Sequence, residues 1–356
     1  MRVSLDPARP LREQPELGHN RWHPELEPIA TVAPGTELTL ELRDSLDGLL
    51  TAASSGEDIL SAPRLPHVLT GPVAVEGVEP GDVLELEILG YETAGFGWTG
   101  VVPGGGVLGD LVERPFLVRW EIGDGVARSE DLPGVSIPAC THAGVIGVAP
   151  SWELFEAARA REQKLADTGA RVALPDVESA FPAAAADGLR TIPPRENGGN
   201  IDIRDLTTGA RLLLPVHVPG ALLSAGDLHF AQGDGEVSQF AIETSGAVTL
   251  RVGVRARDAW TPRFPAYEAP PRPPRRYFAT TGIPLTDEGE NAYLDLGLAM
   301  RRALLELVGW LGTERGLTFE QACALASVAA ELRISEVVDV PNALVSAALP
   351  LDVFDS

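Results

Sequence analysis

Glu37–Asp44 reads ELTLELRD and alternates apolar with polar residues along its length. Asp82–Leu89, DVLELEIL, does the same, and each segment follows a Pro-Gly turn, at Pro34 and at Pro80. Alternation with a period of two is typical of a strand with one buried face. Pro-Gly pairs favour turns between such strands. These two segments therefore predict a β-rich fold.

Short apolar segments of the same kind recur further along the chain. They are FLVRWEI (116–122), VIGVAP (145–150), RLLLPVHV (211–218) and AVTLRVGV (247–254). Strands this short and numerous, separated by Gly and Pro, indicate a β-sandwich or a related β-rich architecture. Between them, Trp152–Asp167 predicts a short helix and Ala170–Ile192 an Ala/Pro-rich loop.

The character of the chain changes after Ala269–Arg276, APPRPPRR, which can form neither a helix nor an inner strand. Asn291–Gly312 has helical spacing, with apolar side chains on one side at Leu296, Met300, Ala303, Leu304, Leu307 and Leu311. A second helix is expected from Thr318, where Thr-Phe-Glu-Gln forms a capping-box pattern, to about Leu332. We therefore predict a β-rich core over residues 1–268. Residues 269–356 should form a connector and a helical segment packed on that core, most simply as one integrated domain.

Composition excludes several classes of function. The formal net charge is −23, and Lys164 is the only lysine. A surface this acidic repels phosphate backbones and anionic lipids, so neither nucleic acid nor membrane is expected as a partner. Two distant cysteines, Cys140 and Cys323, form no CxxC motif. With no signal-peptide pattern at the start and no long apolar run, we expect a soluble cytoplasmic protein.

The segment Gly226–Glu236, GDLHFAQGDGE, concentrates side chains that suit a metal-assisted hydrolytic site. Between three glycines it carries Asp227, His229, Gln232, Asp234 and Glu236. If the segment begins as the end of a strand, Asp227 and His229 share one face, and the following turn returns another carboxylate toward them. A plain hairpin turn would explain the Asp and Gly residues, but it requires neither the His nor the Gln.

The other histidines divide into two groups. His19, His23 and His67 lie in polar or glycine-containing contexts that suit a site, although His19 and His23 could equally pin the N-terminal arm. His142 and His217 lie in apolar, strand-like surroundings and are interpreted as structural.

Taken together, these segments resemble the acetamidase/formamidase family of amide hydrolases. The resemblance rests on blocks that follow one another in order at residues 19–35 (HNRWHPELEPIATVAPG), 67–89, 144–151 (GVIGVAPS), 192–243, 291–311 and 326–342. The most specific are GGNID and GALLSAGDLHFAQGDGE, and the opening HNRWHPEL is closer to the formamidase branch.

The resemblance implies a two-sheet, jelly-roll-like β-sandwich with added helices and hydrolysis of small linear amides such as formamide or acetamide. It also implies a divalent metal, zinc, and a homo-oligomer. The residues agree with metal chemistry: there is no G-x-S-x-G elbow, and neither cysteine has an obvious activating neighbour. A metal-activated water is therefore the more economical nucleophile.

Within the family blocks we predict a metal site built from strand ends beside glycines. Its ligands are drawn from Asp44, His67, His229, Glu236 and Asp227. Asp44 could instead cap a turn. Asp234 is expected as a catalytic group or a partner of the ligands.

Two further groups complete the predicted site. Glu243 is expected to shuttle protons, with Asp202 as a weaker candidate, unless Glu243 simply pairs with an arginine. Gly198 and Gly199 should form a tight loop whose N–H groups approach the substrate, with Asn200 and Gln232 as side-chain contacts. A plain turn is the alternative for the two glycines.

One segment departs from the family pattern. The family often has a Gly-Gly-Gln run after the carboxylate that ends the first strand, whereas Asp44–Leu50 reads DSLDGLL. If that run shapes the amide pocket, this protein takes a different amide or has lost activity. The alternatives to a small-amide hydrolase are a metal- or small-molecule-binding protein and a hydrolase of another C–N bond, such as a lactam.

The homo-oligomer is also expected from the tail, because two amphipathic helices often leave apolar surface beyond what a monomer hides. The side chains expected to contribute are Leu307, Trp310, Leu311, Ala322, Leu325, Val328 and Leu332.

Overall fold

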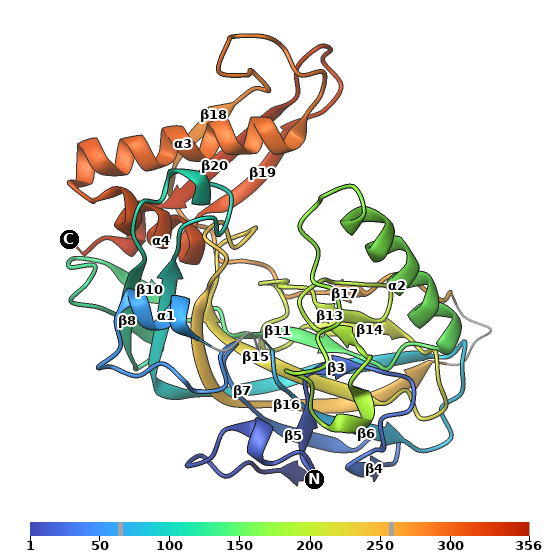
Figure 1. Cartoon of the computed structure of the whole chain (residues 1–356). Coiled ribbons are helices and arrows are strands. Elements are labelled where there is room, and N and C mark those ends of the chain that lie inside the picture. The colour runs from blue at the N-terminus through green and yellow to red at the C-terminus, as the bar shows by residue number, and fades with distance from the viewer. Residues whose placement is uncertain (63–66, 256–259, 356) are drawn as a thin grey trace.

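The computed structural model describes residues 1–62, 67–255 and 260–355. A β-rich body is built from the first three quarters of the chain, and the C-terminal part stands on one end of it (Figure 1). The mainly β architecture with added helices is as expected from the sequence.

The body is organised around two long strands, β7 (Val83–Val101) and β16 (Ile242–Arg255), which pair antiparallel over most of their length. On one side of β16 the sheet continues through β15 (Leu223–Ala231), β11 (His142–Gly147) and β13 (Gly198–Asn200). On the far side of β7 it continues through β8 (Phe116–Gly123), β9 (Val126–Arg128) and β10 (Ser136–Pro138).

Further strands branch from this path and close the apolar core. β5 (Glu37–Leu42) pairs with β16, β6 (Leu69–Val75) with β15, and β14 (Arg211–Pro215) with β7. The remaining short strands of the body are β1 (Arg2–Val3), β2 (Gly18–His19), β3 (Arg21–Trp22), β4 (Ala30–Val32), β12 (Leu189–Arg190) and β17 (Ala266–Glu268).

The alternating segment Glu37–Asp44 forms a strand with one buried face, as its sequence predicts. Leu38, Leu40 and Leu42 of β5 are buried, while the residues between them are at least partly exposed. The buried leucines join side chains of β7 and β16 in one hydrophobic cluster. Burial of this kind stabilises the fold by roughly 1.5–3 kcal/mol for each large aliphatic side chain.

Two helices lie beside the body, α1 (Gly56–Ser61) and α2 (Trp152–Ala166). α2 starts where the sequence predicts, because the Ser151 hydroxyl accepts a hydrogen bond from the Leu154 N–H at 3.2 Å. The following 170–192 stretch is mostly loop, with one 3-10 turn and the short β12.

The C-terminal part contains the two predicted helices, α3 (Leu296–Arg315) and α4 (Phe319–Ala329). The capping box at Thr318 is present, since its N–H donates to the Gln321 side chain at 2.9 Å. The expected end near Leu332 is wrong, because Ala330 is extended and β19 (Glu331–Glu336) begins at the next residue.

That strand belongs to a three-stranded sheet which the helical pattern did not reveal. Its order is β18 (Tyr277–Gly282), β20 (Leu344–Pro350) and β19, all antiparallel. α3 packs against both β18 and β20.

The apolar faces of α3 and α4 are buried within the subunit. Leu307 and Leu325 belong to the same cluster as Phe230 and Ile242 of the body, and Trp310 stacks on Phe278 with ring centroids 3.9 Å apart. The tail and the body therefore share one core. Leu311, Ala322 and Val328 are buried in it as well, so these helix faces are not the surplus apolar surface on which the expected oligomer was argued.

Candidate functional site

Three neighbouring segments bring acidic side chains around one imidazole. Asp227 and His229 come from β15, Glu243 is the register partner of His229 on β16, and Glu236 lies in the turn after β15. His229 Nε2 lies 3.3 Å from Asp227 Oδ1, 3.4 Å from Glu243 Oε1 and 4.0 Å from Glu236 Oε1. Asp202 completes the group, with Oδ1 4.0 Å from His229 Nδ1. We call these five residues the acidic cluster.

The backbone adopts an unusual conformation at this place. Asp202, Asp227 and Glu236 have φ of 44°, 55° and 45°, and His67 beside them has 58°. Positive φ is uncommon for residues other than glycine and tends to concentrate at functional sites. β15 also has a register shift toward β16 between His229 and Ala231. Asp227 and His229 therefore meet through a distorted strand, rather than through the regular alternation that the sequence suggested.

Several polar atoms of this region are buried without a hydrogen-bond partner in the described part of the chain. They include His229 Nε2, Asp227 Oδ1, Asp202 Oδ1 and His67 Nδ1. A buried polar atom without a partner is costly, and a cation bound to His229 would satisfy at least part of this set. Asp227, His229 and Glu243 have ligand atoms close enough to share one ion, and so do Asp202, His229 and Glu236. The residues present thus fit a divalent metal.

Gly144 of β11 leaves open space in the middle of the acidic cluster. A methyl group at its Cα would lie 2.6 Å from His229 Cε1 and 2.7 Å from both Asp202 Oδ1 and Asp227 Oδ2. Cβ atoms do not approach other atoms so closely in real structures. Glycine is therefore the residue that keeps the middle of the acidic cluster open.

Burial raises the pKa values of three acids in the cluster. Burial raises the pKa of both Asp202 and Asp227 to about 7, although the charge of His229 opposes the shift. Burial and the neighbouring carboxylates hold the pKa of Glu236 well above its usual value. Without a bound cation, burial therefore favours the protonated forms of these acids.

His229 and Glu243 respond in the opposite way. Burial lowers the pKa of His229, but the carboxylates of Asp227 and Glu243 outweigh it and hold that pKa well above the usual value. Burial raises the pKa of Glu243, but the adjoining His229 outweighs it and lowers that pKa to about 2. The Ser45 N–H at 3.3 Å and the Ala241 N–H at 3.2 Å also donate to the Glu243 carboxylate. The alternative considered for Glu243, pairing with an arginine, is absent from the described contacts.

Gln232 orients the imidazole from the other side. Its Oε1 lies 2.9 Å from His229 Nδ1 and 3.0 Å from His142 Nε2, and its Nε2 donates to the Asp202 carbonyl at 2.9 Å. In the neutral form of the ring, an N–H on Nδ1 directed at Gln232 leaves His229 Nε2 as the lone-pair atom that faces the acidic cluster. The structure therefore places the Gln232 side chain behind the cluster, as an orienting group.

The acidic cluster has a closed and an open side. The side chains of Asp227, His229 and Glu243 are between 1% and 3% exposed, whereas Asp202 is 21% and Glu236 17% exposed. His67 lies on the same side, with Nε2 3.9 Å from Asp227 Oδ2. A small molecule would therefore reach the site past Asp202, Glu236 and His67.

Two other predicted residues, Asp44 and Asp234, lie outside the acidic cluster. Asp44 accepts hydrogen bonds from the Leu46 and Gly48 N–H groups, which is a turn-capping arrangement. Burial, with Glu243 nearby, raises its pKa to about 6. Asp234 forms an ion pair with Arg272 at 3.0 Å, outside the cluster.

The glycine pair lies in β13. Gly198 closes a tight turn by donating to the Arg195 carbonyl at 3.1 Å, and Gly199 pairs with Ile146 of β11. Asn200 keeps a buried side-chain oxygen without a partner, two residues before Asp202. The tight loop is present, and Asn200 is the member of the group whose side chain keeps a buried oxygen without a partner in the described residues.

The N-terminal histidines are engaged elsewhere. His19 Nε2 lies 2.8 Å from Ser224 Oγ, and His23 packs edge-on against Trp152 and Phe155. Segment 44–50, which departs from the family pattern, contacts the N-terminal arm: the Asp47 carboxylate accepts a hydrogen bond from the Leu11 N–H at 2.7 Å. It therefore anchors the N-terminal arm.

Two residues of the site were not anticipated. His142 was interpreted as structural, yet it is the register partner of His229 and contacts its ring edge-on at 5.1 Å. Gly144 is one of 37 glycines; it opens the family block at residues 144–151, but that block gave it no role in the site. Both become visible only when β11 is placed beside β15.

Comparison with known proteins agrees with this fold. The model of the acetamidase/formamidase family matches residues 4–356. A formamidase from Methylophilus methylotrophus is 35% identical, with 99% of this chain and 93% of the relative covered. An acetamidase from Mycolicibacterium smegmatis is 36% identical, over 90% of this chain and 87% of the relative.

Among solved structures, a gamma lactamase from Delftia acidovorans superimposes with a TM-score of 0.95 at 33% identity, covering 100% of this chain and 94% of that chain. None of the helices in the described residues has the length and apolar character to cross a membrane. The family match spans almost the full length, and two relatives exceed 30% identity over nine tenths or more of the chain. The chain therefore belongs to the acetamidase/formamidase family.

Proposed function

We propose that this protein hydrolyses the carbon–nitrogen bond of small linear amides such as formamide and acetamide, releasing ammonia. The observation that carries the proposal is the acidic cluster, in which a buried His229 with two buried carboxylates adjoins two partly exposed carboxylates. The named formamidase and acetamidase relatives support linear amides as the substrate class.

We infer that Asp227, His229 and Glu243 hold a divalent metal. These three side chains are the most buried of the acidic cluster, and their ligand atoms lie close together. His229 Nε2 and Asp227 Oδ1 have no hydrogen-bond partner among the described residues. His67 and Glu236 lie close enough to complete the ligand set. The imidazoles in the donor set favour zinc over magnesium or calcium, which prefer oxygen ligands alone. When bound, such an ion polarises a carbonyl and lowers the pKa of water.

The remaining residues of the open side have roles that follow from their position. Asp202 lies on the open side with Oδ1 4.0 Å from His229 Nδ1, where its carboxylate can accept a proton from the attacking water and return it to the leaving ammonia. The unpartnered Asn200 oxygen can accept a hydrogen bond from the amide nitrogen of the substrate. Gln232 keeps His229 oriented throughout.

The test is ammonia release from formamide, acetamide and propionamide by the purified protein, with metal content measured in the same samples. Turnover of at least one amide supports the proposal, and no ammonia from any of the three would contradict it. A γ-lactam belongs in the panel, because a gamma lactamase has the same fold at a TM-score of 0.95. Opening of the lactam without ammonia release would favour cyclic amides.

Substitution separates the ligand from the proton-transfer group. Glu243→Gln is expected to lower both metal content and turnover, because it removes a charged ligand from the buried side. Asp202→Asn should keep the metal and lower kcat by roughly 10²–10⁴-fold, the usual range for a lost general base. Elemental analysis and steady-state kinetics on both variants make the distinction. Full turnover by a folded Glu243→Gln protein would exclude a role for Glu243.

The affinity for the metal should depend on pH. Asp202 and Asp227 have pKa values of about 7 in the metal-free protein, so below that pH an incoming ion must displace their protons. His229, whose pKa is also raised, must lose a proton as well, so we expect affinity to rise with pH from about pH 5.5 through the neutral range. Calorimetry in buffers of different ionisation enthalpy measures the proton release directly. An affinity that does not change with pH would contradict this assignment.

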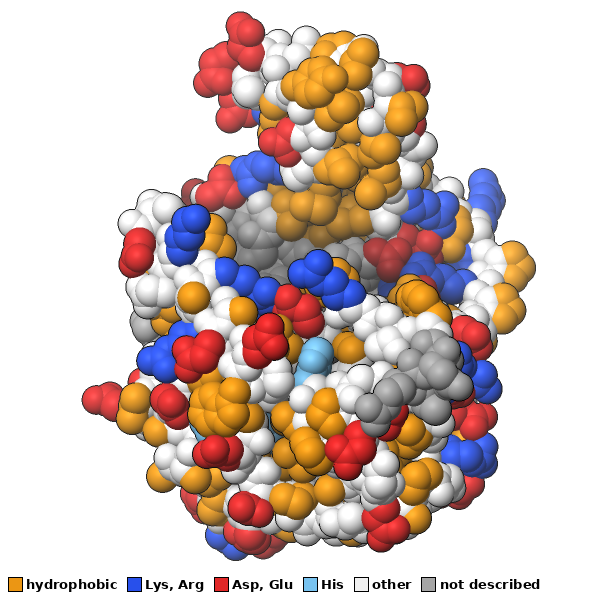
Figure 2. All heavy atoms as spheres, turned by 90° about the vertical axis from the view of Figure 1, so that its right-hand side faces the viewer, with side chains coloured by type: hydrophobic (Ala, Val, Ile, Leu, Met, Phe, Trp, Pro, Cys, Tyr) orange, Lys and Arg blue, Asp and Glu red, His pale blue; other side chains and the backbone are white. Residues whose placement is uncertain are grey.

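We also propose a cytoplasmic location and a homo-oligomeric state. The oligomer is supported by exposed apolar side chains at the end of the C-terminal sheet, where Tyr293 is 70% and Val338 74% exposed. Figure 2 shows hydrophobic side chains gathered on the corresponding protruding part of the molecule.

A further inference from the structure

The three-stranded sheet of the C-terminal part has an open edge at β18. This strand is outermost in the order β18–β20–β19, and all six of its residues pair with β20 without a shift of register. The Arg276 carbonyl accepts the Leu351 N–H, so the alternation of an antiparallel ladder turns the N–H and C=O groups of Ala279 and Thr281 away from β20. No hydrogen bond within the described chain reaches these four groups.

The two edges of this sheet differ in character. The opposite edge strand, β19, carries Arg333 and Glu336 and has a register shift between Ile334 and Glu336. Charges and bulges of this kind protect an edge from pairing with another strand. β18 reads YFATTG, with no charge, no proline and no bulge. It is therefore the edge that is ready to accept a further strand.

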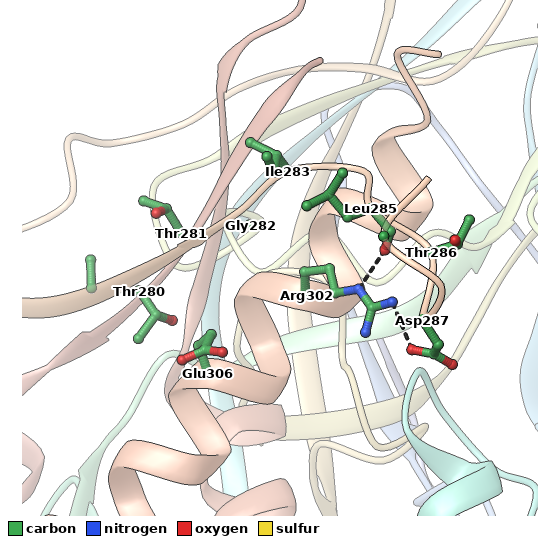
Figure 3. Close-up of a pocket in the computed structure, with 11 residues that line it drawn as sticks. Thr280, Thr281, Gly282, Ile283, Leu285, Thr286, Asp287, Arg302 and Glu306 are labelled. Atoms are coloured by element: carbon green, nitrogen blue, oxygen red, sulfur yellow. Dashed lines mark hydrogen bonds and ion pairs between the residues drawn. The ribbon is translucent and has the colours of Figure 1, made fainter. Parts of the chain in front are cut away.

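An open groove runs along β18. Its volume is about 650 Å³, and it is bounded by the strand, by α3 and by the loop at residues 285–289. Figure 3 shows Arg302 and Glu306 extending from α3 beside the strand. Arg302 donates through Nε to the Leu285 carbonyl and through Nη2 to Asp287, both at 2.7 Å. Nη1 of Arg302 and the Glu306 carboxylate have no hydrogen bond or ion pair among the described residues.

We propose that this edge binds β18 of a second copy of the chain, antiparallel about a two-fold axis, so that two sheets join into one of six strands. The geometry agrees with the packing of the helices. α3 lies over β18 and β20, and strands are spaced by about 4.8 Å, so the two α3 helices would lie about 10 Å apart. Helices pack at about 8–10 Å. The groove is thus filled by the partner's strand, with the partner's helix beside it.

The charges select a second copy over an unrelated peptide. Thr280 donates to the Ala303 carbonyl, which places the middle of β18 level with the middle of the Arg302–Glu306 pair. A two-fold axis there brings Arg302 opposite the partner's Glu306, and the reverse. The two groups that lack partners within one subunit then satisfy each other twice.

The mass of the full-length protein in solution tests the proposal. Light scattering at micromolar concentration should give an even multiple of 37.7 kDa. Thr281→Pro removes an outward N–H without touching the ladder to β20, so it should halve the mass or raise the dissociation constant at least tenfold. Thr281→Val keeps the N–H and the branched shape, and it should behave as the parent protein. Glu306→Arg should also weaken association, because it would face Arg302 of the other copy.

Circular dichroism and melting temperature show whether each variant is folded, and hydrogen exchange over residues 277–282 should show protection that falls on dilution. Thr281 lies outside the acidic cluster, so amide turnover by Thr281→Pro tests the proposed activity separately from the assembly. A parent protein that is monomeric would overturn the proposal. So would a Thr281→Pro variant that keeps the parent mass, or a foreign peptide found in the groove at one copy per chain.

Discussion

Replacing His229 with Gln should abolish metal binding and lower kcat/KM for amides by about 10³-fold or more. His229 is the one residue common to both groups of side chains that can share an ion. Glutamine has similar bulk but offers no imidazole nitrogen, and metal-dependent hydrolysis loses both its Lewis acid and its activated water when the ion is lost. Elemental analysis and ammonia release measure the two effects on the same preparation.

The matched control is His217→Gln, which replaces another largely buried histidine that no contact places in the acidic cluster. This control should retain metal and activity. If His229→Gln kept a full complement of metal and normal turnover, the acidic cluster would not be the active site.

Gly144→Ala should be nearly as damaging, although it adds a single methyl group. That methyl would lie within 2.7 Å of His229, Asp202 and Asp227, in the space that the ion is proposed to occupy. We expect metal affinity to fall by at least 100-fold and turnover to fall in parallel, the upper end of the effects seen when groups around a metal are disturbed. Calorimetric titration with Zn²⁺ gives the affinity.

Gly90→Ala provides the control for the backbone effect of the same substitution. Gly90 also lies in a strand, β7, but a methyl group there meets nothing within 4 Å. It should leave affinity and turnover unchanged. A Gly144→Ala protein that still bound Zn²⁺ as the parent does would show that the ion lies elsewhere.

The architecture could be read from the sequence wherever one residue pattern decides one element. Glu37–Asp44 became β5 because alternating leucines need a buried face, and Thr318 starts α4 because it caps the first turn. The β18–β20–β19 sheet could not be anticipated, since β18 and β20 are separated by two helices and pair only after those helices have packed. Local patterns carry no information about such distant pairing.

The candidate site divides in the same way. The density of acids in Gly226–Glu236 indicated the chemistry, and the structure brings Asp227, His229 and Glu236 together with Glu243. Asp234, from the same segment, turns outward to Arg272 because the turn points its side chain to the other face. His142 and Gly144 depend on the neighbour that β11 acquires in the sheet. Sequence could thus name the acids, but not the residues that surround them.

The left-handed backbone at His67, Asp202, Asp227 and Glu236 has a consequence for engineering. A residue with a Cβ in that conformation costs about 1–2 kcal/mol, a penalty that glycine avoids. Glycine at any of these four positions would relax the backbone, and at the acids it would also relieve repulsion among buried carboxylates. Stability and hydrolysis are therefore opposed at the same residues. Selection for thermal stability alone would favour glycine at these four positions, and the most stable variants would be folded but inactive.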